Sequence, residues 1–263
     1  MQALQEMKEI ELLAEKKTII HQLNPVTKLI TTMVYIIVVI SCGILQWELL
    51  LSLLLYPYLL LLLGELPISL ITKRVLKTIP FLLLVGIFHP MIHREPYAVV
   101  VGTVVITEGM IAFITLLLKG MLTISSVLIL AATTGIVNIG AAMRKLYVPE
   151  LLVTQIELLY RYLSVLGQEA SNVSKAYHLR SGKVKGISLK HSGSLLTNLL
   201  FRSYDRAKAV YDAMCLRGYR RKLHRSDVRP MEKKDYSYLM IWLTLLLMIR
   251  LLNPALLIAG LMD

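Results

Sequence analysis

The chain has 263 residues, of which 56% are hydrophobic and 17% charged, and it carries a formal net charge of +12. Its mean hydropathy of +0.64 lies outside the range of ordinary soluble domains. The apolar residues come in long runs of Leu, Ile and Val, which predicts membrane-spanning segments. Two cysteines support neither a disulfide framework nor a cysteine metal site.

Two apolar segments open the chain and are predicted to form a helical hairpin. The first follows Asn24 and Pro25, a pair that suits the start of a helix, and extends to about residue 45. The second covers residues 49–64 and contains Pro57, which a helix in lipid tolerates as a kink. The charged, amphipathic residues before these segments do not resemble a cleavable signal.

A third apolar run, residues 81–92, is short for a full crossing. We expect it to be tilted, or to extend backwards into the basic amphipathic segment at residues 66–80. Residues 93–109 are rich in β-branched side chains between Pro and Gly, which predicts a short hairpin outside the membrane.

The fourth span, residues 108–135, is the longest and has Lys119 near its middle. An unpaired lysine at the bilayer centre costs ~2.5–3.5 kcal/mol. Lys119 is therefore expected either to pair inside the bundle or to snorkel towards the membrane surface.

Positive charge is concentrated in residues 136–235, which hold nineteen of the 29 Lys and Arg residues but eight of the 17 Asp and Glu residues. A block this basic could bind nucleic acid, but it has no RRM-type aromatic pattern, zinc finger or heptad basic region. In membrane proteins, Lys and Arg collect on cytoplasmic loops. We therefore expect a cytoplasmic block and no nucleic-acid partner.

Two long helices are predicted in this basic block. The first starts at Pro149 and ends at Ser181 and Gly182, and a linker rich in Gly, Lys and Ser follows. The second covers about residues 195–216, and Gly218 is placed to stop it. Its apolar stripe consists of Leu196, Leu200, Ala207, Val210 and Met214. In the first helix, Glu157 and Arg161 are spaced for an intrahelical ion pair.

The two helices end alike: Arg180 and Arg217 each follow a leucine and lie just before a helix stop. The shared pattern comprises Arg180, Ser181, Gly182, Leu216, Arg217 and Gly218. A cation at a helix carboxyl end complements the helix dipole, for ~0.3–1 kcal/mol. Alternatively, each guanidinium docks in a groove of a partner through paired hydrogen bonds. Two matched ends would suit two copies of one partner.

A last apolar run, residues 238–262, is counted as a fifth span. We therefore expect an all-α membrane protein with about five transmembrane helices and a cytoplasmic domain of coupling helices. The expected domains are an N-terminal membrane domain of about four spans at 1–135, a cytoplasmic domain at 136–236 and a C-terminal transmembrane segment at 237–263. The amino terminus and the basic block would lie inside.

The sequence resembles the transmembrane T component of energy-coupling factor (ECF) transporters, particularly the T proteins of cobalt and nickel uptake. The resemblance covers nearly the whole chain. It rests on four segments, "NPVTKL", "ITEGM", "LYVPELLVTQIELLYRYL" and "FRSYDRAKAVYDAMCLRGY". T proteins carry two short Ala-Arg-Gly-like motifs at the ends of coupling helices, and each motif inserts into a groove of an ABC ATPase subunit.

The resemblance implies these contacts for Arg180, in "LRS" followed by Gly182, and for Arg217, in "LRG"; leucine replaces the usual small residue before each arginine. The implied partners are two ABC ATPases, a substrate-binding S component and the lipid bilayer of a bacterial inner membrane. Lys119 would be a possible contact with the S component. The implied cargo is cobalt or nickel ion, with a vitamin such as biotin as the alternative.

A rival hypothesis is a membrane-anchored scaffold whose basic block binds anionic lipid or nucleic acid. An enzyme is not expected, because the chain has no phosphate-binding loop and no HExxH motif, and its predicted spans hold no carboxylate pair and no Ser or Cys near a His. His89 and His93 are spaced as a metal-binding pair, but Pro90 interrupts them and no third ligand is evident. We therefore expect no metal site and no cofactor.

Overall fold

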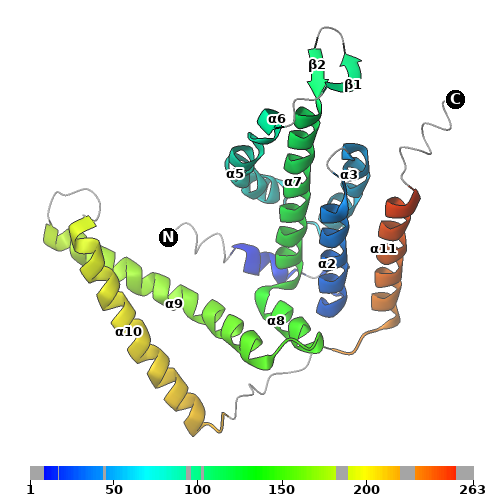
Figure 1. Ribbon diagram of the computed structural model, residues 1–263. Helices are drawn as coiled ribbons and strands as arrows, with labels where there is room; N and C mark the ends of the chain where they lie inside the picture. Colours follow the sequence, from blue (N-terminus) through cyan, green and yellow to red (C-terminus); the bar gives the residue numbers. More distant parts are fainter. Residues whose placement is uncertain are drawn as a thin grey trace. The chain divides into compact units, whose positions relative to one another are not determined.

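The computed structural model describes residues 9–16, 18–43, 46–92, 96–101, 104–181, 189–219 and 229–252. By their contacts they divide into two compact units. The bundle unit comprises Glu11–Gly135 and Val228–Asp263, and the long-helix unit comprises Met1–Ile10 and Ile136–Asp227. Apart from one two-stranded ribbon, the regular elements in the described ranges are helices, in agreement with the predicted class (Figure 1).

Helix α2 (Pro25–Ser41) begins as the sequence predicts. Asn24 is its N-cap, and its side-chain oxygen accepts a hydrogen bond from the backbone N–H of Val26 at 3.0 Å. Pro25 occupies the first helical position, where the missing N–H would have had no partner inside the helix. The helix ends at Ser41, before the expected residue 45.

The second predicted span is divided into α3 (Trp47–Leu53) and α4 (Leu55–Leu63). Pro57 explains the break, because a proline has no N–H to donate to the carbonyl four residues earlier, that of Leu53. Tyr35 of α2 supplies the missing donor, and its hydroxyl donates to the Leu53 oxygen at 3.0 Å. The expected effect of Pro57 appears as a one-residue interruption of the helix at Leu54.

Aromatic rings form the centre of the bundle. Tyr35 and Tyr56 stack with their centroids 4.3 Å apart, and Trp242 of α11 (Lys233–Leu252) meets Tyr56 edge-on at 4.7 Å. All three side chains are buried. Such pairs contribute ~0.5–1.5 kcal/mol each beyond the area they bury. They tie the first two predicted spans to the last.

The chain between α4 and the fourth predicted span follows the expected order. Helix α5 (Ile68–Gly86) joins the basic segment to the third apolar run, so the predicted backward extension is confirmed. A turn leads to α6 (His89–Ile92). The predicted hairpin is also confirmed, because β1 (Pro96–Val101) pairs antiparallel with β2 (Val104–Thr107). Strand β2 continues directly into α7 (Glu108–Thr134).

Glycines allow α5 and α7 to approach closely. A Cβ atom added at Gly120 would lie 2.6 Å from a methyl carbon of Leu82, and one added at Gly86 would lie 2.7 Å from the ring of Phe113. Small residues at helix contacts are typical of membrane bundles. The two contacts also show that α5 and α7 run antiparallel.

Two lysines fix the direction of α7 against α2. Lys28, in the first turn of α2, donates to the backbone oxygen of Thr133 at 2.8 Å. Lys119 donates to the backbone oxygen of Cys42, just beyond the other end of α2. Helices α2 and α7 are therefore antiparallel.

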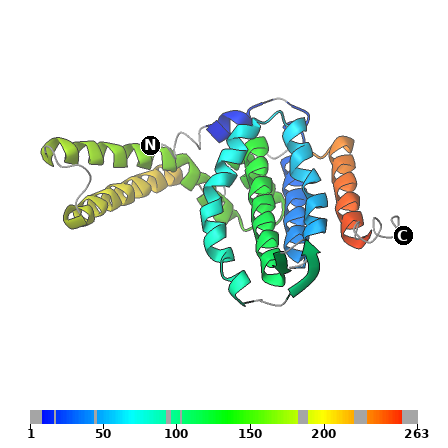
Figure 2. The ribbon, with the colours of Figure 1, turned by 90° about the horizontal axis from the view of Figure 1, so that it is seen from above.

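Helix α11 runs parallel to α2. The backbone N–H of Asn24 donates to Asp235 at 2.8 Å, and Arg250 donates to the backbone oxygen of Ser41 at 3.1 Å. Within the bundle unit, both views show α5, α7, α2 and α11 side by side in this order (Figures 1 and 2).

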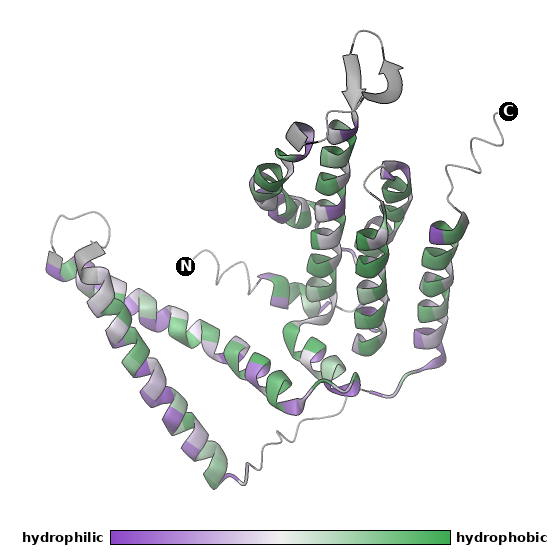
Figure 3. Ribbon diagram, viewed as in Figure 1, coloured by the Kyte–Doolittle hydropathy of each residue, from purple (hydrophilic) through white to green (hydrophobic). Residues whose placement is uncertain are grey.

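By length and composition, α7 is the one helix in the described ranges that could cross a membrane; Pro25–Ser41 and Trp47–Leu63 are apolar but shorter. The rest of the fifth predicted span, after Leu252, lies outside the described residues. Hydrophobic colour nevertheless dominates the bundle helices (Figure 3). Large apolar side chains exposed on them include Ile37, Ile40, Phe81, Leu84, Ile87, Leu247 and Leu251.

The long-helix unit contains α8 (Ile136–Lys145), α9 (Glu150–Ser181) and α10 (Leu189–Leu216). Helix α9 follows Pro149, as predicted. The prediction for α10 was wrong at its start, because the helix begins at Leu189, inside the expected linker. Gly193 does not prevent this, since a glycine in an exposed helix costs only about 1 kcal/mol relative to alanine.

Candidate functional site

The end of α10 is closed by a Schellman motif. Gly218 has φ of +82°, a left-handed conformation that glycine adopts without steric cost. Its N–H bonds to the oxygen of Cys215, and the N–H of Tyr219 bonds to the oxygen of Met214, both at 3.0 Å. The expectation that Gly218 stops this helix is confirmed. Arg217 is thereby held at the helix terminus with its side chain exposed.

The end of α9 presents the second arginine. Arg180 is exposed and precedes Ser181, the last helical residue, whereas Gly182 lies outside the described residues. Leu179 is 86% exposed, and Leu216, its counterpart on α10, is 90% exposed. Each helix end therefore offers an apolar side chain beside a guanidinium that can make paired hydrogen bonds.

Helices α9 and α10 run antiparallel and are joined by an ion pair between Arg202 and Glu169 at 2.7 Å. Arg180 is in the last turn of α9, whose end meets the first turns of α10, whereas Arg217 directly follows Leu216 at the other end of α10 (Figure 1). At 1.5 Å per residue, α10 is about 40 Å long. The two arginines therefore lie too far apart to contact one small groove.

The first part of the predicted apolar stripe of α10 is open to solvent, whereas Val210 and Met214 are half-buried. Leu196 and Leu200 are 66% and 67% exposed, and Tyr204 continues the same face at 67%. An exposed apolar face of this kind is typical of a surface that a partner covers.

The corner between α8 and α9 depends on residues that the sequence reasoning missed. Arg144 of α8 forms an ion pair with Glu157 of α9 at 2.8 Å, and Glu157 is buried. From their spacing of four residues, Glu157 was predicted to form an ion pair with Arg161 instead. Tyr147, in the turn between the helices, has φ of +60°. The feature of the sequence that could have drawn attention to Arg144 is its position in the last turn of α8, where basic residues are favourable.

Lys119 and the two candidate histidines lie in the bundle unit. The hydrogen bond from Lys119 to Cys42 shows the expected pairing inside the bundle; contact with an S component stays a prediction. His89 lies in α6, and its Nδ1 is buried without a hydrogen-bond partner in the described structure; His93 lies outside that part of the chain. Within the described ranges, no three His, Cys, Asp or Glu side chains gather to hold a metal ion.

Comparison with known proteins adds a family and three relatives. The family model described as CbiQ, cobalt transport protein, matches residues 16–230, a range that includes both Arg180 and Arg217. The nickel permease LarQ of Lactiplantibacillus plantarum is 31% identical over 104 residues, covering 40% of this chain and 38% of the permease.

The other two relatives are uncharacterized proteins of Methanocaldococcus jannaschii. MJ1571 is 27% identical over 135 residues, covering 51% of this chain and 46% of the relative. MJ1089 is 33% identical over 101 residues, covering 38% of each. The matched segments thus span less than half the length of each of these relatives.

Proposed function

The chain belongs to the CbiQ family of cobalt transport proteins, and on this basis we propose that it is the membrane coupling subunit, or T component, of an ECF-type importer. In this role it passes ATP-driven movement from two ABC ATPase subunits to a substrate-binding S component. It is a transport component and not an enzyme, and ATP hydrolysis belongs to its partners.

The observation that carries the proposal is the pair of matched helix ends. Arg180 and Arg217 are both exposed, each follows a leucine that is more than four-fifths exposed, and they lie at the carboxyl ends of two different helices, α9 and α10. A purely local role at the helix dipole would not require either exposed leucine. Two separate, chemically alike contact points suit two copies of one ATPase.

The direction of the bundle helices supports a multi-pass membrane protein. Going along the chain, α2, α3 with α4, α5 and α7 alternate in direction, and α11 runs parallel to α2. Five crossings would require this alternation of directions. The exposed apolar side chains of the bundle would face lipid, because only an apolar solvent covers them without cost.

The proposed orientation follows the positive charge. Residues 136–236 would form a cytoplasmic coupling domain in a bacterial inner membrane, with the amino terminus also inside, because basic segments stay on that side. The β1–β2 ribbon would then lie outside.

Cobalt or nickel ion is the proposed cargo. The family description names cobalt, and the name of LarQ specifies nickel. The S component would select the ion, since the described part of this chain gathers no metal-binding cluster.

Co-purification tests the proposal. The chain is co-expressed with cobalt-type ATPase and S subunits of its own organism, and the ATPase recovered with it is measured. Arg180→Ala and Arg217→Ala should each reduce that recovery and Co²⁺ uptake. Arg206→Ala, which removes an exposed arginine from the middle of α10, is the matched control. Equal recovery in all three variants would refute the proposed contacts.

A further inference from the structure

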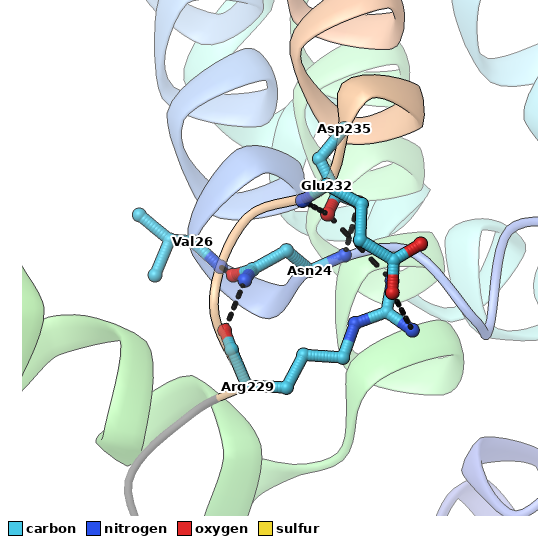
Figure 4. Close-up of polar contacts among 5 residues, drawn as sticks. All are labelled: Asn24, Val26, Arg229, Glu232 and Asp235. Atoms are coloured by element: carbon cyan, nitrogen blue, oxygen red, sulfur yellow. Dashed lines mark hydrogen bonds and ion pairs between the residues drawn. The ribbon is translucent and has the colours of Figure 1, made fainter.

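The first turn of α2 contacts the chain where it re-enters the bundle unit. The side chain of Asn24 donates to the backbone oxygen of Arg229 at 2.8 Å, and its backbone N–H donates to Asp235 at the same distance (Figure 4). Asp235 also lies 3.6 Å from the guanidinium of Arg229. Because the bundle unit resumes at Val228, these contacts lie immediately after the return from the long-helix unit.

The same turn contacts the chain where it leaves the bundle unit. Lys28, one helical turn after Asn24, donates to the backbone oxygen of Thr133 at 2.8 Å. Thr133 lies two residues before Gly135, the last residue of this part of the unit, which has φ of +74°. One turn of α2 therefore holds both chain connections to the long-helix unit.

Burial makes these contacts expensive to break. Asn24 and Asp235 are fully buried, and Lys28 is 4% exposed. A buried polar or charged group that loses its partner is strongly unfavourable.

We propose that Asn24 and Lys28, here called the α2 clamp, are positioning residues through which movement of the long-helix unit enters the membrane bundle. This inference rests on the proposed coupling function. If both of its chain connections were flexible, the long-helix unit could move without displacing the bundle. Fixing both connections to one turn of α2 makes them move as a single body.

Two substitutions each remove one side-chain donor of the clamp. Asn24→Ser keeps an oxygen that can cap α2 but loses the amide donor to Arg229. Lys28→Met keeps an apolar chain of similar length and removes the donor to Thr133. Lys16→Met is the matched control, because Lys16 also donates to a backbone oxygen in the bundle unit, that of Glu65, at 2.9 Å.

The first measurement needs no partner. In the purified full chain, amide hydrogen exchange is followed at residues 131–135 and 229–235. We expect exchange to become at least tenfold faster at 131–135 in Lys28→Met and at 229–235 in Asn24→Ser, with no change in Lys16→Met. Unchanged exchange in both clamp variants would overturn the clamp, whatever the function of the chain.

The second measurement is the number of Co²⁺ ions taken up per ATP hydrolysed by the reconstituted complex. We expect each clamp variant to assemble, to keep at least half of the ATPase rate, and to lower this ratio fivefold or more. An unchanged ratio, or an equal fall of ATPase and uptake with loss of complex, would overturn the coupling role. Failure of the proposed function would look different, because the wild-type chain would then recover no ATPase.

Discussion

Asp235 accepts the backbone N–H of Asn24 at 2.8 Å, although 211 positions separate them in the sequence. The second oxygen of Asp235 accepts the N–H of Glu232 at 2.9 Å, just before α11. This is half of a capping box, in which the third residue of a helix bonds back to its N-cap. One buried carboxylate therefore both starts α11 and fixes it to α2.

Asp235→Ala should destabilise the bundle unit. It leaves the buried N–H of Asn24 without its acceptor, at a cost of about 1–3 kcal/mol, and also removes the acceptor of the part-buried N–H of Glu232. Thermal unfolding in detergent, followed by the fluorescence of Trp242 and Trp47, measures the change. Asp212→Ala, which alters an exposed carboxylate of α10, is the control. The capping role of Asp235 is excluded if the two variants have the same melting temperature.

Gly86→Ala should also lower stability, because the new Cβ would lie 2.7 Å from two ring carbons of Phe113. Overpacking against a rigid ring costs about 1–3 kcal/mol. Gly120→Ala is the matched comparison. Its Cβ meets the end of the flexible Leu82 side chain, and alanine gains up to about 1 kcal/mol in helix propensity.

Melting temperatures of the two glycine variants decide this prediction. We expect a clear decrease for Gly86→Ala and little change for Gly120→Ala. The reverse order would show that the α5–α7 contact is not limited by the ring of Phe113.

Lys119→Met separates two roles of this lysine. It removes the charge-assisted hydrogen bond to Cys42, worth about 1.5–3 kcal/mol. We expect a lower melting temperature of the isolated chain and unchanged recovery of the S component, because the ammonium is already directed at Cys42. A selective loss of the S component at normal stability would instead show the contact implied by the resemblance.

Acid should destabilise the segment before α2 through His21. Burial of the ring, and then the positive charge of Lys28, lower the pKa of His21 below its usual 6.5. The unfolded chain therefore binds a proton at a higher pH than the folded chain does. The contribution of neutral His21 to the free energy of unfolding is fully present above pH 6.5. It is lost as the pH falls from 6.5 towards the folded-state pKa.

The pH dependence of melting between pH 7.5 and 5.5 tests this assignment. We expect the decrease on acidification to be smaller in His21→Gln than in the wild-type chain. The same decrease in both would mean that another group is responsible.

Local features of the fold were predictable from the sequence because their causes are local. Asn24 and Pro25 set the start of α2, Pro57 sets the break before α4, and Gly218 sets the end of α10 through a left-handed backbone. Each depends on the geometry of a few neighbouring residues. The β-branched segment after His93 likewise predicted the ribbon.

Contacts between distant segments could not be predicted in this way. The spacing rule paired Glu157 with Arg161, but the structure pairs it with Arg144, because packing of α8 on α9 brings the two together. The distant hydrogen-bond partners of Asn24 and Lys28 could not be predicted from the sequence either, because they lie more than 100 residues away. The start of α10 was missed for another reason, because glycine and serine only weaken an exposed helix.

The central claim is that Arg180 and Arg217 attach the chain to its ATPases, and co-purification of the Arg180→Ala, Arg217→Ala double variant tests it most directly. The account predicts that ATPase recovery falls at least tenfold, while membrane insertion and the melting temperature stay at their wild-type values. Moderate salt should not release the ATPases from the wild-type chain, since the proposed contacts combine apolar and paired hydrogen-bond interactions. Wild-type recovery of ATPase with the double variant would contradict the account.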